Sequence, residues 1–581
     1  MIRPLTASMS VAAMLLAAIA VAAPAISNAA SANPGPNSRH ASKYSEISFR
    51  GVPASKAGKI TVRGSRTGFH SYSRKRHSDN RGFSLVMKKA FAVSETVRVN
   101  SALPIAGAKR GDYSFRVENL GGPRNKKYSN ASLSDGGPAQ FKSRPDLLPP
   151  TLNVRRNLDA AGTDPILVGA KNRGTAIYEN DGNPIWFRSG RSTDFRTGTY
   201  KGKPVLTWVE APTAGSGLKR TSYTIANRAY KVIKRFTPGN AYAADSHEFR
   251  LTKRNTAFVT SYRTVKADLR HLGLSKNGRV SDSIAQEVDL RSGRVIWEWH
   301  SLDHVPIKQS YAKGPKFPGQ PYDYFHINSV IDTPDGNVMI SGRSTNTVYK
   351  VSRHTGRIIW ALGGKRSDYK LSKQAKFSWQ HDAQPLSGNR VSLFDNSDSP
   401  VAAKPWANQS RGLILQLNNK KKTATVSDQF KNPLKPLSPT QANVQALPSG
   451  GYLVAFGQVP IISEFGPSGN MVYDATVDTS GGFYRAYRQP WVGLPKTAVD
   501  IATEPNGNKT KLWASWNGDS RVVTWRVLAG PTEDNLSAVG EFPRTGFETT
   551  MNAATADSFV KVEGINPGGK TIGNSAVEKV R

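Results

Sequence analysis

The sequence predicts an all-β protein whose largest part is a β-propeller. Between about 150 and 530, a turn followed by a short apolar stretch with an aromatic residue recurs about every 50 to 60 residues, as in "SGRVIWEW" and "TGRIIWAL". No amphipathic helix interrupts these stretches, and all 11 tryptophans lie in this span. Short strands at this spacing are typical of propeller blades, and six or seven blades fit the length.

The N-terminus predicts an export signal. Arg3 precedes the apolar stretch Val11–Ala23, and small residues follow it. This stretch is too short to span a bilayer, and the small residues suit signal peptidase. We therefore expect residues 1–30 to be a signal peptide cleaved between 29 and 32. The mature protein is expected to be secreted or associated with the cell wall, without a transmembrane anchor.

Changes in composition predict the domain boundaries. Residues 43–118 contain short alternating stretches such as "KITVRG" and "YSFRVE", which indicate a small β-sandwich in front of the propeller. Residues 119–150 are rich in Gly, Pro and Ser and are predicted to be a linker. We expect the propeller to occupy 151–530. Residues 531–581 return to strand and turn patterns and are expected to close or cap it.

The composition limits the chemistry and the partners. Lys and Arg number 80 and Asp and Glu 42, which gives a formal charge of +38 and favours anionic partners. Wall polymers and phosphate or sulfate esters fit this charge, and we predict no nucleic-acid partner. The chain has no cysteine, which excludes disulfides, thiol nucleophiles, zinc ribbons and iron–sulfur clusters.

Other motifs are weaker. "GINPGGKT" (564–571) fits the P-loop pattern, but the ten residues after it are too few for the helix that the motif needs, so we expect a hairpin. "DSHEF" lacks the second histidine of H-E-x-x-H, since Leu251 stands at that position. His300 and His304 are four residues apart and could share one face of a helix. However, Trp297 and Trp299 before them alternate as in a strand. We predict no metal and no cofactor.

A possible oxyanion site remains, formed by His247, His326, Arg343 and His381. In a propeller, residues from several blades meet at one end of the central channel. An arginine fork binds two oxygens of a sulfate or phosphate group. A neutral imidazole can attack sulfur or phosphorus, or move a proton. Taken singly, each histidine fits a structural role at least as well, so the residues alone lead no further.

At these residues the sequence resembles the arylsulfotransferase family, in particular its exported branch in actinobacteria and fungi. The matching phrases include "DSHEFRLT" (245–252), "DYFHINSV" (323–330), "SGRSTNTVYKV" (341–351), "WQHDAQ" (379–384) and "SLFDNSDSP" (392–400). The resemblance implies a six-bladed propeller. It also implies transfer of a sulfuryl group from an aryl sulfate ester to a phenol, without the nucleotide sulfate donor.

The resemblance further implies a role for each residue. His381 would be the nucleophile that forms a sulfohistidine intermediate. His326 and Arg343 would bind the sulfuryl oxygens, and His247 would exchange a proton with the phenolic oxygen. Phe394 and Tyr324 are candidates for contact with the aryl ring. Asn328 is a further candidate for substrate binding.

Two alternatives stay open. The first is a non-catalytic propeller that binds an anionic cell-wall polymer or glycan, which the basic composition supports. The second is a quinoprotein-like dehydrogenase, because "TGRIIW" phrases also occur in such propellers. That enzyme needs a calcium-bound quinone, and the sequence has no evident acidic cluster to hold the ion.

Overall fold

Strands dominate the computed structural model, which describes residues 29–109, 111–119, 140–213, 218–397 and 409–580. The all-β prediction is confirmed, since α1 (Ser301–His304) is the only α-helix among these residues. No helix in the described part has the length and apolar character needed to cross a bilayer. Residues 1–28 of the predicted signal peptide lie outside the described residues. Short 3-10 turns are η1 (Ala54–Lys56), η2 (Arg270–Leu272), η3 (Ile307–Gln309), η4 (Arg343–Thr345) and η5 (Lys373–Ala375).

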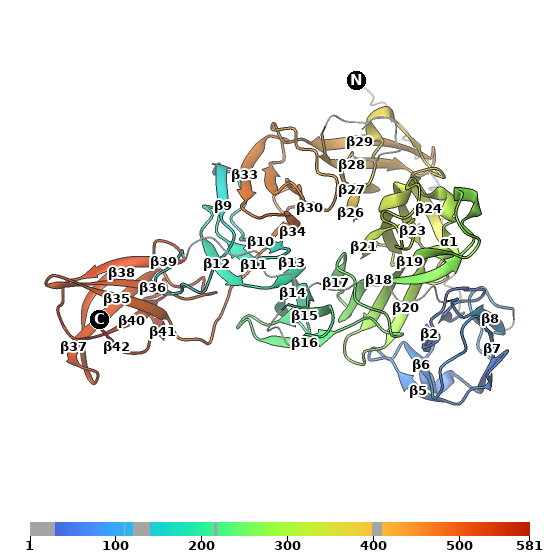
Figure 1. Cartoon of the computed structure of the whole chain (residues 1–581), viewed down its shortest axis with the longest axis horizontal. Helices are drawn as coiled ribbons and strands as arrows, with labels where there is room; N and C mark the ends of the chain where they lie inside the picture. Colours follow the sequence, from blue (N-terminus) through green and yellow to red (C-terminus); the bar gives the residue numbers. More distant parts are fainter. Residues whose placement is uncertain (1–28, 110, 120–139, 214–217, 398–408, 581) are drawn as a thin grey trace, which may run out of the picture.

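Six sheets stand in a ring around a central axis (Figure 1). Their pairing is antiparallel apart from one short parallel pair. From the axis outward, the strands of the six sheets are β34 (Phe483–Arg488), β10 (Ile166–Ala170), β11 (Gly174–Tyr178), β12 (Pro184–Arg188); β13 (Arg191–Tyr200), β14 (Lys203–Ala211), β15 (Ser222–Ala226), β16 (Val232–Phe236); β17 (Phe249–Leu251), β18 (Thr256–Ala267), β19 (Gly278–Asp289), β20 (Val295–His300); β21 (Ile327–Asp332), β22 (Val338–Gly342), β23 (Thr347–Val351), β24 (Ile358–Gly363); β26 (His381–Leu386), β27 (Arg390–Asp395), β28 (Arg411–Asn418), β29 (Thr423–Phe430), β25 (Lys370–Leu371); and β30 (Asn443–Ala446), β31 (Tyr452–Ala455), β32 (Ile461–Phe465), β33 (Met471–Val477), β9 (Leu152–Asn157).

Aromatic residues fill the spaces between neighbouring sheets. Trp186 of β12 packs 5.8 Å from Phe195 of β13 between ring centroids. Trp299 of β20 lies 5.6 Å from Phe325, just before β21. Large aromatic rings bury much apolar surface, so this packing stabilises each sheet only against its neighbours. The recurring aromatic position in the sequence therefore marks contacts between sheets.

Two strand pairings close the ring. β34 pairs with β10 and becomes the innermost strand of the first sheet, while β9 pairs with β33 and becomes the outermost strand of the sixth. The first and last segments of the ring are thus interlocked. Residues 531–581 were expected to close or cap the ring, and they do not close it, because β34 makes the closing pair and ends at Arg488.

The C-terminal residues form a separate pair of sheets. The phrase "DSRVVTW", which resembles the blade pattern, leads into a strand that pairs within this unit, so the expected boundary at 530 is also wrong. "GINPGGKT" spans the turn between two strands, as predicted for a hairpin. The strands are β35 (Asp500–Asn506), β36 (Lys509–Ser515), β39 (Glu548–Ala553); and β38 (Asn535–Pro543), β37 (Thr524–Thr532), β40 (Phe559–Ile565), β41 (Thr571–Asn574), with β42 (Glu578–Lys579) beside β40.

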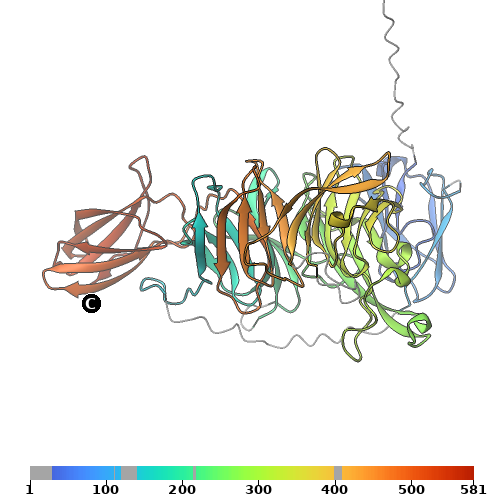
Figure 2. The same cartoon turned by 90° about the horizontal axis from the view of Figure 1, so that it is seen from above.

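The N-terminal residues form two further sheets that share one apolar core, with Phe49, Phe83 and Phe115 buried in it. Ser78 of this unit donates a hydrogen bond of 2.7 Å to Asp289 of the ring. Figure 2 shows the ring between the N-terminal and C-terminal units. The strands are β1 (Ser31–Asn33), β2 (Ile47–Arg50), β6 (Gly82–Met87), β5 (Tyr72–Arg76); and β4 (Gly68–Phe69), β3 (Ile60–Gly64), β7 (Thr96–Ser101), β8 (Tyr113–Arg116).

The predicted linker is only partly described, since 120–139 lie outside the described residues. Its last part is packed against the C-terminal unit. Phe141 lies 4.5 Å from Phe547 between ring centroids, and the Ser143 N–H donates to Glu548 over 2.6 Å. This part is therefore structured, although its Gly- and Pro-rich composition predicts a linker.

Candidate functional site

The three predicted histidines occupy matching positions in three successive sheets. His247 comes two residues before β17, His326 comes directly before β21, and His381 is the first residue of β26. These are the innermost strands of their sheets, and Figure 1 shows them side by side at the axis. Because the three strands begin at the same face of the ring, the histidines gather at that mouth of the central channel.

His247 and His326 contact each other, and each has a carboxylate partner. Their ring centroids lie 4.9 Å apart, with the planes almost perpendicular at 79°. His247 Nδ1 lies 2.6 Å from an oxygen of Asp245, and His326 Nδ1 lies 2.7 Å from an oxygen of Asp323. A carboxylate at Nδ1 fixes the orientation of the ring and leaves Nε2 directed elsewhere. Both histidines are therefore positioned with Nε2 available.

His326 has a left-handed backbone conformation, with φ of 56°. This conformation is uncommon for residues other than glycine and is concentrated at functional sites. It turns the chain directly before β21, and the backbone carbonyl of His326 accepts a hydrogen bond of 3.0 Å from the Arg343 N–H. The two residues are thus tied together through the backbone.

The hydrogen bonds around His381 define its tautomer. The backbone N–H of Gln441 donates to Nε2 over 3.2 Å. Nδ1 lies 3.1 Å from the backbone carbonyl of Trp379 and 2.7 Å from Oδ1 of Asn396. A backbone N–H can only donate and a carbonyl can only accept. The proton is therefore on Nδ1, and Nε2 carries a lone pair.

Burial keeps His381 neutral. The side chain is almost completely buried, and this burial lowers the pKa of His381 well below its ordinary value. The positive charge of Arg343 lowers the pKa further, while the hydrogen bond with Asn396 opposes the shift. Burial also lowers the pKa of His326, against the opposing effect of Asp323. Both imidazoles are consequently neutral near pH 7.

Arg343 lies on the face of an indole ring. Its guanidinium carbon is 3.4 Å from the ring centroid of Trp379, and Nη2 donates to the carbonyl of Pro439 over 3.3 Å. Arg343 follows β22 in η4, at the end that faces the start of β21. Stacking on an aromatic face holds the planar group in a fixed orientation. It supplies a positioned cation within electrostatic range of His381.

The three residues predicted to contact the substrate belong to the interior. Phe394 and Tyr324 are fully buried in apolar clusters, where they pack against other side chains. Phe394 packs 5.3 Å from Phe456, and the Tyr324 hydroxyl donates to the carbonyl of Val305. Asn328 is also fully buried and donates to the carbonyl of Gln380 over 2.7 Å. Its role is to hold the segment before His381.

A layer of buried ion pairs lies below the histidines. Arg485 is completely buried and contacts Asp194 at 3.1 Å, Glu248 at 3.2 Å and Asp382 at 3.4 Å. Glu248 and Asp382 directly follow His247 and His381. Removing one partner of a buried ion pair leaves an uncompensated charge, which is strongly destabilising. The layer thus fixes the backbone on which two of the histidines stand.

Several residues that position the site were not predicted from the sequence. Asn396 stands in the phrase "SLFDNSDSP", and Asp245 and Asp323 stand close to their histidines in the phrases that carry the resemblance. Gln441 has no such signal, because it approaches His381 from the sixth sheet. Among the described residues, no group of three or more His, Asp or Glu side chains is arranged to hold a metal ion.

One comparison with known proteins finds a family for part of the chain. Residues 196–478 match the family model described as Arylsulfotransferase (ASST), and this span contains all four predicted residues. No curated protein matches the chain in sequence.

The solved structures that match the chain share little sequence with it and have low TM-scores. A protein of unknown function from Bacteroides caccae is 12% identical with a TM-score of 0.35, covering 56% of this chain and 98% of its own. A catalytically inactive virginiamycin B lyase from Staphylococcus aureus, solved with quinupristin, is 10% identical with a TM-score of 0.27, covering 64% and 91%. The Dos1 propeller is 9% identical with a TM-score of 0.28, covering 61% and 73%.

Fold and site define an all-β, propeller-like protein that brings three imidazoles and a guanidinium to one mouth of its channel. The family match gives this class a name. This part of the chain, residues 196–478, belongs to the arylsulfotransferase family.

Proposed function

We propose that the protein is an exported sulfotransferase built on a six-bladed propeller. It moves a sulfuryl group from an aryl sulfate ester to a phenol through a sulfohistidine at His381, and it needs no nucleotide sulfate donor. The observation that carries this proposal is the Nε2 lone pair of His381, which lies within electrostatic range of Arg343, His326 and His247. A neutral, positioned imidazole next to a fixed cation is what attack on an anionic ester requires.

In the first half-reaction, Nε2 of His381 gives up the hydrogen bond from the Gln441 N–H and attacks the sulfur of the ester. The N–S bond forms while the S–O bond to the aryl group breaks, and its electron pair leaves with the phenolic oxygen. His247 donates a proton to this oxygen. Asp245, 2.6 Å from Nδ1 of His247, stabilises the imidazolium that supplies the proton.

Arg343 and His326 bind the oxygens of the sulfuryl group. The transition state spreads negative charge over these oxygens, so positioned cations and N–H donors stabilise it. A bound anion raises the pKa of a neighbouring imidazole because it favours the charged form. His326 thus takes up a proton when the ester binds and donates from Nε2, with Asp323 at Nδ1.

In the second half-reaction, the acceptor phenol enters the same pocket after the donor's phenol has left. His247 accepts the phenolic proton, and the oxygen attacks the sulfur of sulfohistidine. The O–S bond forms, the N–S bond breaks, and its electron pair returns to Nε2 of His381. The covalent intermediate explains how one site serves donor and acceptor in turn.

The test is p-nitrophenol release from p-nitrophenyl sulfate, with and without a phenol acceptor. Acceptor-dependent release that is lost in His381→Ala and Arg343→Ala, and retained in His271→Ala, supports the proposal. His271 is an exposed histidine on η2 and provides the matched control. Release that persists in His381→Ala contradicts the proposed nucleophile.

A second candidate function, binding of an anionic wall polymer without catalysis, is favoured by a hollow beside the second sheet. The hollow has a volume of about 600 Å³, and no acidic residue lines it. None of its basic residues forms an ion pair with a carboxylate of the described chain. They are Lys201, Lys203, Arg228, Lys234, Arg291 and Lys496. If many donors and acceptors gave no sulfuryl transfer and a teichoic-type polymer bound tightly, this candidate would be favoured over the transferase.

A further inference from the structure

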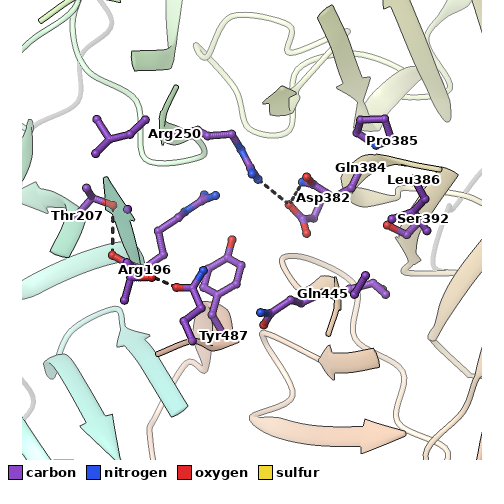
Figure 3. Close-up of a pocket in the computed structure, with 16 residues that line it drawn as sticks. Arg196, Thr207, Arg250, Asp382, Gln384, Pro385, Leu386, Ser392, Gln445 and Tyr487 are labelled. Atoms are coloured by element: carbon purple, nitrogen blue, oxygen red, sulfur yellow. Dashed lines mark hydrogen bonds and ion pairs between the residues drawn. The ribbon is translucent and has the colours of Figure 1, made fainter. Parts of the chain in front are cut away.

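A second cavity lies at the opposite end of the channel from the histidines. Its volume is about 300 Å³, within the range of small-molecule sites. It is lined by the ends of the innermost strands, such as Arg250 and Leu251 of β17 and Gln384 and Leu386 of β26 (Figure 3). His247 comes just before β17 and His381 begins β26, so these two histidines stand at the other ends of the same strands. None of the four predicted catalytic residues lines this cavity.

The layer of buried ion pairs separates the two ends. Arg485 fills the middle of the channel and has no exposed surface. Asp382 reaches the far cavity, while His381, the residue before it, belongs to the other face. The cavity is thus a site in its own right, and what occupies it does not depend on the proposed reaction.

Several polar atoms of the cavity lining lack hydrogen-bond partners in the described chain. They are Nε of Arg196, the hydroxyl of Tyr487 and the hydroxyl of Ser392. These side chains are at least nine-tenths buried, with exposures of 5%, 5% and 0%. A buried polar group without a partner is unfavourable by about 1–3 kcal/mol, so native structures usually satisfy it. Each of these three groups can donate a hydrogen bond, but the atoms have almost no accessible surface, so small side-chain shifts must bring them to a ligand with acceptor oxygens.

Arg250 is the most weakly engaged cation of the lining. Its shortest ion-pair distances are 3.7 Å to Glu248 and 4.0 Å to Asp382, whereas Arg196 lies 2.7 Å from Glu248. The guanidinium of Arg250 donates no hydrogen bond to any residue that the structure describes. Figure 3 shows Arg250 and Asp382 pointing toward each other across the cavity. An oxyanion between them would receive the N–H donors that Asp382 does not reach.

The charges of the layer allow an additional anion. Three arginines face three carboxyl groups, so the layer is balanced when all are ionised. Burial raises the pKa of Asp382, against the opposing effects of Arg485 and Arg250. Protonation of Asp382 leaves one positive charge without a counter-charge, and this charge favours an anion. The six groups are Arg196, Arg250, Arg485, Asp194, Glu248 and Asp382.

We propose that this cavity binds a small oxyanion, such as sulfate, phosphate or a small carboxylate, with Arg250 as its main cationic ligand. After small side-chain shifts, the hydroxyls of Tyr487 and Ser392 and the Nε–H of Arg196 would supply further hydrogen bonds. Leu251, Pro385, Leu386, Val444 and Ala446 form the apolar part of the wall. These apolar residues and the small volume limit the site to compact ligands.

The experiment is calorimetric titration of inorganic sulfate, phosphate and acetate into the full-length Arg343→Gln variant, which removes the main cation of the histidine face. Saturable binding of at least one of these anions is expected. Adding Arg250→Gln should weaken it about tenfold or more, since a charge-assisted hydrogen bond is lost. Tyr487→Phe and Ser392→Ala remove only hydroxyl groups and should weaken binding while leaving the melting temperature nearly unchanged.

Two results would overturn the inference. One is the lack of saturable binding of all three anions to Arg343→Gln. The other is binding that neither Arg250→Gln nor the two hydroxyl variants weaken. Because this assay measures binding at the far end of the channel, it can fail while sulfuryl transfer is present, and it can succeed while transfer is absent.

Discussion

Nδ1 of His381 donates a hydrogen bond to Oδ1 of Asn396, 2.7 Å away. The amide of Asn396 is itself oriented, because its Nδ2 donates to the carbonyls of Ser438 and Gln441 over 2.8 and 3.1 Å. The side-chain oxygen therefore faces the imidazole. A single amide fixes both the proton on Nδ1 and the lone pair on Nε2, and several predictions depend on this pair.

Replacing Asn396 by Asp should change the pH dependence of activity. A carboxylate beside Nδ1 favours the imidazolium, so the pKa of His381 rises from its depressed value. Less of the neutral nucleophile is then present at acidic pH. We expect the acidic limb of the kcat/KM profile to move up by about one pH unit or more. Asn389→Asp, an exposed change in the same sheet, is the control. An unchanged limb in Asn396→Asp would contradict the role of this pair.

Replacing Arg343 by Lys should lower kcat/KM about a hundredfold. Lysine keeps the charge but loses the planar group that lies 3.4 Å from the Trp379 ring centroid. Arg270→Lys changes an exposed arginine and should leave activity unchanged. Steady-state kinetics with p-nitrophenyl sulfate measures both variants. Activity of Arg343→Lys within a few-fold of the parent would mean that charge alone suffices.

Binding of the sulfate ester should weaken as the pH rises. The pKa of His326 is lowered in the free protein, and a bound anion raises it, so binding takes up a proton between these two values. The KM for the ester should therefore increase with pH in this window, by up to about tenfold per unit. In His326→Gln, KM should be higher and lack this dependence. The same slope in parent and variant would exclude His326 as the linked group.

The contribution of Glu118 to stability should fall as the pH rises from about 4.5 to 7. Burial raises the pKa of Glu118 from 4.5 to about 7, against the opposing effect of Arg263. A carboxyl group with a raised pKa in the folded state contributes stability below its unfolded pKa, and this contribution is lost as the pH passes the folded value. The difference corresponds to about 3 kcal/mol at most. In denaturant unfolding, the free energy of unfolding of the parent should fall relative to that of Glu118→Gln over this range, and a constant difference between the two would contradict this role of Glu118.

The regular spacing of turns and aromatic residues predicts the ring, because each sheet repeats the same local pattern. The strands that close the ring cannot be predicted in this way. β34 and β9 pair with strands more than 300 residues away, and nothing local distinguishes such a strand from its neighbours. The strand containing Trp525 carries the same pattern but pairs within the C-terminal unit. The boundary at 530 is therefore misplaced in the sequence-based prediction, because the true boundary depends on pairing between distant strands.

The candidate site divides in the same way. His247, His326, Arg343 and His381 are recognisable because each stands in a distinctive phrase. Phe394 and Tyr324 stand in such phrases too, yet they pack into the interior. From the sequence alone, an aromatic residue near a site fits core packing and substrate contact equally well. Gln441 reaches His381 only through the contact between the fifth and sixth sheets. Contacts of this kind have no local signature.

Mass analysis of peptides after brief reaction with p-nitrophenyl sulfate, without an acceptor, tests the central claim most directly. The account predicts one added SO₃ group on the peptide that contains His381, absent in His381→Ala and lost when a phenol is added. A parent protein that releases p-nitrophenol only with acceptor and never carries this group, or carries it on another residue, would contradict the account.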